Sequence, residues 1–287
     1  MDLLVQLLAN GIVNGSHYAL LALGFGLIFG TTRVVHFAYG PVYALSAYGA
    51  WVCAAHFGAP LWLAVVGSVV TGVVFGVLSY LLVYQPFERR GSPALVVLIA
   101  SLGLFIVLEN AIGVVFGTDT KVVPNPPGGI LLLGPLVLTG SQMWQVAAFV
   151  VVSIALGLYL TRARMGKAVL AMTDNAEMAR VIGIDTARVS IIAFAIGSAI
   201  AAVPAALILF KDGATAHMGF MAVFMAFVAV VVGGVGSLRG AVLGGLVLGI
   251  VESTGMVRIP TEWQSTVAFV VLFVVLLFRP RGLFGGR

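Results

Sequence analysis

Seven polar side chains lie inside or beside long apolar runs of this sequence, and they are the first candidates for chemistry. A polar group among apolar residues is costly when it has no partner. Each of the seven therefore either contacts a ligand or pairs with a neighbouring segment. For the two carboxylates both interpretations are open, whereas for the two histidines a structural hydrogen bond is favoured. The seven residues are Asn14, His17, His36, Tyr39, Glu109, Asn110 and Glu252.

The sequence lacks the patterns that would give these side chains a catalytic role. We find no Ser-His-Asp order, no paired carboxylates and no HExxH run. The single cysteine, Cys53, excludes an intrachain disulfide and a cysteine-based metal cluster. A nucleotide P-loop needs Lys followed by Ser or Thr, but Lys121, Lys167 and Lys211 are followed by Val, Ala and Asp. We therefore expect no catalytic residue, no metal site and no cofactor bound by this chain.

The composition is that of a protein that resides in lipid. Hydrophobic residues make up 61% of the 287 positions, charged residues make up 9%, and the mean hydropathy is +1.15. A soluble domain carries about a quarter charged residues, so this apolar share exceeds what an aqueous core could hide. The net charge of +5 lies at the ends of apolar segments, which argues against a nucleic-acid partner. We expect one all-α integral membrane domain over residues 1–287.

Apolar segments of about 20 residues, the length that crosses a bilayer, recur along the whole chain. We count nine predicted spans, and eight to ten are compatible with the pattern. The first is interrupted by polar residues and is compatible with one tilted helix or with two pieces. It is too long for a signal peptide and has no basic flank, so we expect it to be the first span. The segments are 3–30, 37–56, 61–84, 94–117, 145–161, 189–210, 218–238, 241–257 and 264–278.

The lysines and arginines predict how these spans are oriented. Positive residues concentrate in cytoplasmic loops. Three lie in one set of alternate loops: Lys121, Lys211 and Arg258. The other twelve lie in the opposite set: Arg33, Arg89, Arg90, Arg162, Arg164, Lys167, Arg180, Arg188, Arg239, Arg279, Arg281 and Arg287. Nine spans reproduce this split with the N-terminus outside and the C-terminus in the cytoplasm.

Two segments between the spans are long enough to have structure of their own. Residues 118–144 are rich in Pro and Gly and predict an external, turn-rich loop. In the internal segment 162–188, Asp174 followed by Glu177 is a variant of the helix capping box, and Gly183 is a typical helix C-cap. We predict a short helix over 175–182, with Asp185 or Thr186 capping the next span. From these residues alone, a simple connector is the favoured interpretation of the helix.

Glycines recur at intervals of four residues near the C-terminal end of the chain. This spacing on a helix lets two backbones approach closely. The run 233–240 also predicts a tight turn or a broken helix. The glycines that we expect to pack helices together are Gly236, Gly240, Gly244, Gly245 and Gly249.

Three separated blocks of the sequence carry a resemblance to a known family. They are NGSHYALLALGFGLIFGTTRVVHFAYG with PVYALSAYG near the start, GKAVLAMTDNAEMARVIGIDTARV from Gly166, and GGVGSLRGAVLGGLVLGIVES from Gly233. Their order and spacing resemble the high-affinity branched-chain amino-acid permeases of ABC importers, in particular the shorter of the two membrane subunits. One departure is HFAYG at 36–40, where the family usually shows an Asn-Phe-Ala-His-Gly type sequence, and this exchange leaves the solute open.

The resemblance implies a division of labour among several subunits. Such a permease is a transmembrane subunit of the bacterial inner membrane that forms the solute path together with a second permease, usually a different chain. Two cytoplasmic ATPase subunits use ATP and Mg, and a periplasmic binding protein delivers the solute. The resemblance also implies that the internal helix docks into the ATPase. The residues matching that segment are Asp174, Asn175, Ala176, Glu177, Ala179 and Gly183.

Two other classes of membrane protein are alternatives. An ion-coupled secondary carrier would use Glu109 or Glu252 as a proton or sodium site and would transport without an ATPase. A membrane-embedded enzyme would need clustered His, Asp, Glu or Cys near one interface, and the sequence contains no such cluster.

Overall fold

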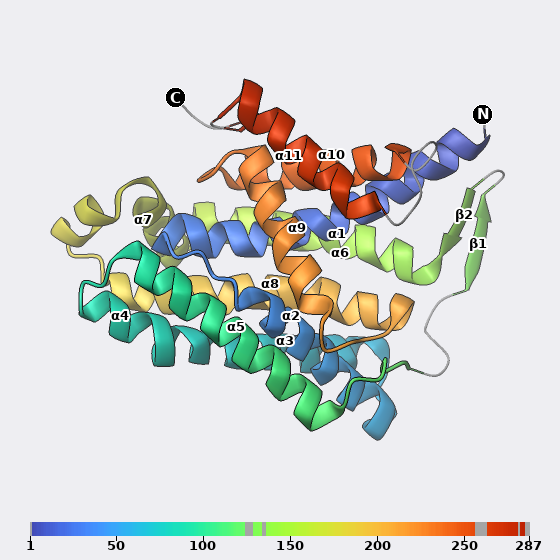
Figure 1. The fold of residues 1–287 in the computed structure, drawn as a ribbon, viewed down its shortest axis with the longest axis horizontal. Helices are drawn as coiled ribbons and strands as arrows, with labels where there is room; N and C mark the ends of the chain where they lie inside the picture. Colours follow the sequence, from blue (N-terminus) through green and yellow to red (C-terminus); the bar gives the residue numbers. More distant parts are fainter. Residues whose placement is uncertain (1, 124–128, 134–135, 256–262, 281, 285–287) are drawn as a thin grey trace.

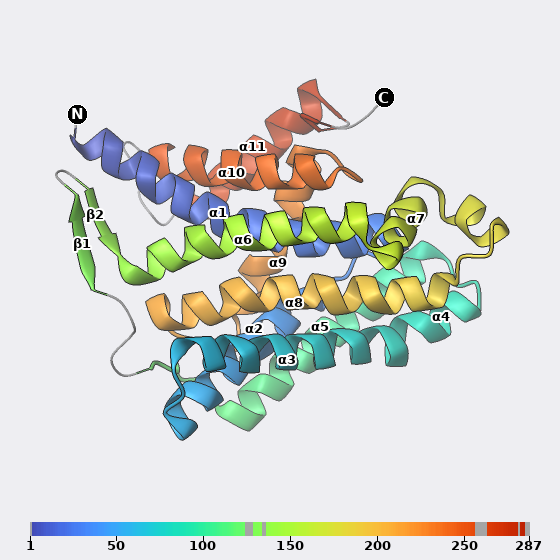
Figure 2. The same ribbon diagram turned by 180° about the vertical axis from the view of Figure 1, so that it is seen from behind.

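Helices make up almost all of this structure, which is a computed structural model (Figures 1 and 2). It describes residues 2–123, 129–133, 136–255, 263–280 and 282–284. The first half contains α1 (Asp2–Thr32), α2 (Tyr39–Trp51) with the π-helical turn η1 (Val52–His56), α3 (Leu61–Ser79) with η2 (Tyr80–Tyr84) and α4 (Gln85–Arg89), and α5 (Ala94–Phe116). The second half contains β1 (Ile130–Leu133), β2 (Leu136–Thr139), α6 (Gly140–Arg162), α7 (Arg164–Val181), α8 (Thr186–Asp212), α9 (Met218–Gly233), α10 (Leu238–Gly255) and α11 (Gln264–Phe278).

The prediction of a polytopic helical membrane protein is confirmed. Six helices in the described part of the chain are long and apolar enough to cross a membrane, and two shorter apolar helices accompany them. The predicted number of nine spans is therefore approximate. The first apolar segment forms one continuous helix, α1, in which Gly11 and Gly15 pack against the backbone of α10 instead of ending the helix.

Two boundaries differ from the sequence prediction. A short antiparallel hairpin, β1 with β2, lies inside the predicted loop 118–144, of which residues 124–128, 134 and 135 lie outside the described residues. The helix α6 begins at Gly140 instead of 145, since Thr139 and Gln142 form a capping box there. Arg258, Arg281 and Arg287 of the predicted charge split also lie outside the described part.

The two ends of the bundle differ in what they carry. One end carries the start of α1, the β1–β2 hairpin and the start of α6, and we call it the hairpin end (Figure 1). The other carries α4 and α7, and we call it the α7 end (Figure 2). Most of the described basic residues lie toward the α7 end, in α4, in α7 and at the start of α10.

The two halves of the bundle repeat one motif with opposite direction. In each, a long helix (α1 or α8) is followed by a short non-helical return and a shorter helix (α2 or α9) that begins inside the bundle. The packing follows the same symmetry, because α1 lies against α10 as α8 lies against α3. The starts of α2 and α9 cross at Gly40 and Gly219, where the two backbones touch. This crossing lies at the centre of the inverted repeat.

Glycines also form the seam between α1 and α10. A Cβ added at Gly245 or Gly249 of α10 would fall on the backbone of α1, and one at Gly15 would fall on that of α10. On the other side of α10, Gly240 and Gly244 approach the backbone of α9 in the same way. Only glycine permits such short distances between helices.

Gly236 has a different role from the one that the sequence predicted. It lies in the turn between α9 and α10 with φ of 86°, and an added Cβ would meet open space. The prediction that it packs two helices is therefore wrong, since its positive φ, and not close packing, favours glycine there. The predicted tight turn at 233–240 is present.

Candidate functional site

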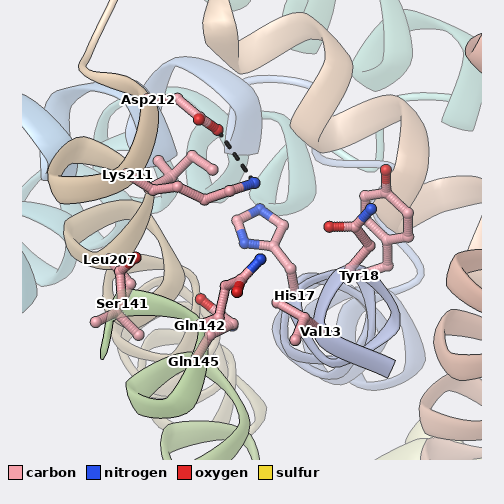
Figure 3. A pocket seen from close by; sticks show the side chains of 11 residues that line it. Val13, His17, Tyr18, Ser141, Gln142, Gln145, Leu207, Lys211 and Asp212 are labelled. Atoms are coloured by element: carbon pink, nitrogen blue, oxygen red, sulfur yellow. Dashed lines mark ion pairs between the residues drawn. The ribbon is translucent and has the colours of Figure 1, made fainter. Parts of the chain in front are cut away.

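A polar cavity of about 290 Å³ opens between α1, α6 and α8 at the hairpin end (Figure 3). In Figure 3 the imidazole of His17 lies between the glutamines of α6 and Lys211 of α8. The Lys211 ammonium lies 3.5 Å from the Asp212 carboxylate. Donors and acceptors of both charge signs thus face one small volume, an arrangement that suits a small solute carrying both charges. The polar lining residues include Asn14, His17, Tyr18, Gln142, Gln145, Lys211 and Asp212.

A second cavity of about 310 Å³ adjoins the first and has a more apolar wall. The two share four lining residues, His17, Tyr18, Ile208 and Asp212. The Tyr43 hydroxyl of α2 lies 3.2 Å from His17 Nε2 and forms part of the boundary. Methionines, whose side chains adapt to different apolar shapes, line the α9 side: Met218, Met221 and Met225. A polar region therefore leads into an apolar one.

Glu252 supports this site from α10. Its side chain is buried, and its Oε1 accepts a hydrogen bond from the Tyr18 hydroxyl at 3.1 Å. Tyr18 lines both cavities, so the carboxylate fixes the orientation of a wall residue. Of the seven polar candidates, the structure thus brings Asn14 and His17 to the cavity and places Glu252 behind its wall.

His36 and Tyr39 lie deeper, at the return between α1 and α2. His36 is fully buried, and its Nδ1 lies 2.8 Å from the Tyr84 hydroxyl, which donates to Ser101 Oγ. Ser101 Oγ also accepts from the backbone N–H of Phe37 at 2.7 Å. Tyr39 donates to the Leu21 carbonyl across the bundle. The Phe37 N–H belongs to the non-helical return, and the Ser101 hydroxyl gives it an acceptor inside a membrane protein, where water is unavailable to do so.

Replacing Ser101 with alanine is expected to destabilise this return. The change removes the nearer acceptor of the Phe37 N–H, which also donates to the Val35 carbonyl at 3.2 Å, and the Ser101 acceptor of the buried Tyr84 hydroxyl. The expected cost is about 1–3 kcal/mol. The measurement is the apparent unfolding midpoint of the purified chain. Ser153→Ala is the control, because the Ser153 hydroxyl has no hydrogen-bond partner among the described residues. Equal midpoints for the two variants would contradict the assignment.

Glu109 and Asn110 lie away from the two cavities' polar walls. Glu109 of α5 pairs with His217, which immediately precedes α9, with 3.0 Å between Oε1 and Nδ1. The side chain of His217 is 74% exposed and that of Glu109 17%. Asn110 is exposed, and its amide donates to the Ile106 carbonyl of its own helix. The sequence left the role of Glu109 open, and the structure pairs it with a histidine that sequence analysis did not single out.

The predicted internal helix is the second half of α7. Non-helical backbone at Asn175, with φ of −155° and ψ of 102°, divides α7 into two helices. Asn175 Oδ1 accepts from the Met178 N–H at 2.9 Å, so Asn175 is the N-cap. The predicted cap, Asp174, is therefore wrong by one residue, because Asn175, not Asp174, breaks the helical backbone. The first half of α7, Arg164 to Asp174, was not predicted as a helix.

The end of this helix has the geometry that the sequence indicated. Gly183 has φ of 88°, its N–H donates to the Arg180 carbonyl, and the Ile184 N–H donates to the Ala179 carbonyl. This pair of bonds is a Schellman motif. Asp185 then caps α8 by accepting from the Arg188 N–H. Ala179 is buried, whereas Asp174, Ala176 and Glu177 are exposed.

Several wall residues escaped sequence analysis. Lys211 and Asp212 end an apolar segment and look like loop charges, and Tyr18, Tyr43 and Gln145 look like ordinary residues of apolar spans. Only the packing of α1, α2, α6 and α8 brings them together. Across the described residues, no group of three or more His, Cys, Asp or Glu is placed to hold a metal ion.

The family model and two similar proteins that match this chain are all described as permeases of branched-chain amino acid transport systems. Residues 7–276 match the model of the family described as branched-chain amino acid transport system, permease component. The permease protein BraD of a high-affinity branched-chain amino acid transport system, from Pseudomonas aeruginosa, is 35% identical, over 98% of this chain and 95% of its own length. LivH from Escherichia coli, of a system with the same description, is 33% identical over the same shares.

A solved structure supports the fold independently of sequence. PsaBC from Streptococcus pneumoniae, in complex with Fab, superposes with a TM-score of 0.54 at 10% identity, covering 95% of this chain and 91% of the matched chain. At this identity the likeness concerns the fold alone.

Proposed function

This chain belongs to the family of permease components of branched-chain amino acid transport systems, and on that premise we propose that it moves branched-chain amino acids across the bacterial inner membrane. The observation that carries the proposal is the match over nearly the whole chain to BraD and LivH. The permease function requires no catalytic residue of its own. The solute would be received from a periplasmic binding protein, so its path needs to release it easily.

The two joined cavities support an amino acid as the solute. An amino acid carries an ammonium and a carboxylate next to an apolar side chain. The polar cavity with His17, Lys211 and Asp212 offers partners for both charges, and the methionine wall of the second cavity suits a branched aliphatic group. Asn14 and Gln145 add neutral hydrogen-bonding groups.

The proposed orientation places the α7 end in the cytoplasm. The basic residues of α4 and α7 support it through the positive-inside rule. The hairpin end, with the N-terminus and the polar cavity, would then face the periplasm, from which the solute arrives.

The second half of α7 is proposed to dock into the ATPase. It presents exposed apolar side chains, Met178 at 57%, Val181 at 77% and Ile182 at 68%, which suit a protein partner. Ala179 holds the helix against the bundle, and caps at both ends keep it short and rigid. A rigid helix transmits the movement of its partner to the spans, whereas a flexible loop would absorb it.

The complete transporter is proposed to contain several chains. A second permease, a different chain in the usual arrangement of the family, would complete the solute path. Two ATPase subunits would bind ATP and Mg, and no cofactor would be held by residues 1–287, which form a single permease domain.

Reconstitution tests the proposal directly. Proteoliposomes with this chain, its partner permease, the ATPase subunits and the binding protein are expected to accumulate radiolabelled leucine only when ATP is inside the cytoplasmic compartment. Omitting the ATPase is expected to abolish uptake. Leucine uptake driven by a proton or sodium gradient with this chain alone would instead identify a secondary carrier, and uptake of other solutes but not leucine would reject the proposed solute.

A further inference from the structure

We propose that Glu109 and His217 lie on the wall of the aqueous solute path, where they contact the charged groups of the passing amino acid. This proposal rests on the proposed transport function and deepens it. The two residues come from different elements, α5 and the return before α9, so the fold brings them together across more than a hundred residues of sequence.

The first argument is the free-energy cost of exposing Glu109 and His217 to lipid. Glu109 belongs to a span, α5, whose exposed side chains are mostly apolar, including Ile106, Val107 and Val114, with Asn110 as the polar exception. An ionisable pair on the lipid side of such a span is expensive, at roughly 2.5–3.5 kcal/mol for one charged group at the bilayer centre. The imidazole of His217 is nevertheless 74% exposed on this chain. We infer that water, and not lipid, covers this part of the surface.

The second argument is the position of the pair beside the methionine-lined cavity. His217 is followed directly by Met218, and Met221 lies one helical turn after His217 on the same side of α9. Both methionines line the second cavity. Neither His217 nor Glu109 lines that cavity, but His217 lies next to two residues that do. We infer that the solute path continues from the second cavity past this pair.

The third argument is the chemistry of the two groups. Nδ1 of His217 is held by Glu109, which leaves Nε2 at the exposed edge of the ring. In its protonated form the imidazole can donate from Nε2–H to an arriving carboxylate, while an arriving ammonium can donate to the Glu109 carboxylate. The pair thus offers weak, exchangeable contacts to a zwitterion, as a path that must release its solute requires.

Cysteine accessibility in the assembled transporter tests the proposal. Cys53→Ala removes the single native thiol and supplies the background for single cysteines. In this background, a charged, membrane-impermeant methanethiosulfonate is expected to modify His217→Cys about tenfold faster than Val107→Cys during ATP turnover, because thiolate formation requires water. Val107 is the matched control, since it lies on α5 two residues before Glu109, is 63% exposed and faces away from the pair. Should His217→Cys fail to assemble, Met221→Cys replaces it.

Protection by solute tests the contact itself. Saturating leucine with the binding protein is expected to slow modification of His217→Cys several-fold and to leave a thiol in the hairpin loop unaffected. Modification no faster than that of Val107→Cys would overturn the placement on the path. Fast modification without protection would overturn the contact with the solute. Leucine uptake by the Cys53→Ala transporter is measured in parallel. If that assembled transporter takes up leucine, either outcome overturns only the role of Glu109 and His217. If it assembles but takes up no leucine, the proposed solute is rejected instead.

Discussion

A transporter with Gly183→Val is expected to lose most of its solute uptake while its spans remain folded. Gly183 has φ of 88°, and a β-branched residue in this region costs about 1–2 kcal/mol. That energy corresponds to a factor of about 5–30 in population, so the ratio of open to closed ends of the α7 helix would rise by this factor. Met178, Val181 and Ile182 would then no longer form one rigid docking surface. The measurements are ATP-driven leucine uptake and stimulation of the ATPase by the binding protein, and both are expected to fall together.

Gly91→Val is the matched control for this prediction. Gly91 also has a positive φ, 62°, and open space around it, and it lies in the loop after α4 at the same end of the bundle. The two variants therefore carry similar backbone strain, and they differ in whether the strain affects α7. We expect Gly91→Val to keep most of its uptake. Equal losses in both variants, or full uptake in Gly183→Val, would show that the second half of α7 does not couple the ATPase to the spans.

The two ends of this helix show what the sequence can predict about local structure. Gly183 was correctly predicted as a C-cap because the signal is local: a glycine after an Ala-rich segment, before a polar cap. The N-cap was misplaced from Asn175 to Asp174 because both residues are good capping acceptors. The choice between them depends on where the first half of α7 ends against the bundle, through buried Val169 and Met172, and that packing is a tertiary property.

The candidate site shows the same division between local and tertiary information. Asn14 and His17 were found because polar residues stand out within an apolar span. His217 and Lys211 were not singled out, since they lie at the ends of apolar segments, where polar residues are common. These residues reach the site because the non-helical returns bring the ends of the apolar segments back into the bundle. No local sequence pattern predicts such a return. The inverted relation of the two halves was invisible for the same reason.

The crossing of α2 and α9 predicts a large structural effect from the smallest possible substitution. In Gly219→Ala the new Cβ would fall on the carbonyl group of Gly40 and close to the nitrogen of Pro41. Backbone cannot rotate away as a side chain can, so the two helices would have to separate. Overpacking of this kind costs about 1–3 kcal/mol or more, and we expect a clearly lower apparent unfolding midpoint for the purified chain. Reduced uptake should accompany it, because α9 carries the methionine wall of the second cavity.

Gly157→Ala separates this effect from a general effect of adding a methyl group to a helix. Gly157 lies in α6 with nothing near the position of its Cβ. Alanine is a better helix former than glycine by about 1 kcal/mol, so this variant is expected to be as stable as the parent or slightly more so. If Gly219→Ala has the same apparent unfolding midpoint as Gly157→Ala, the backbones of α2 and α9 do not touch. If the midpoint falls for Gly219→Ala alone, the stability of the bundle depends on the crossing of α2 and α9. This contact joins the two inverted halves where each non-helical return ends, because α2 and α9 both begin there.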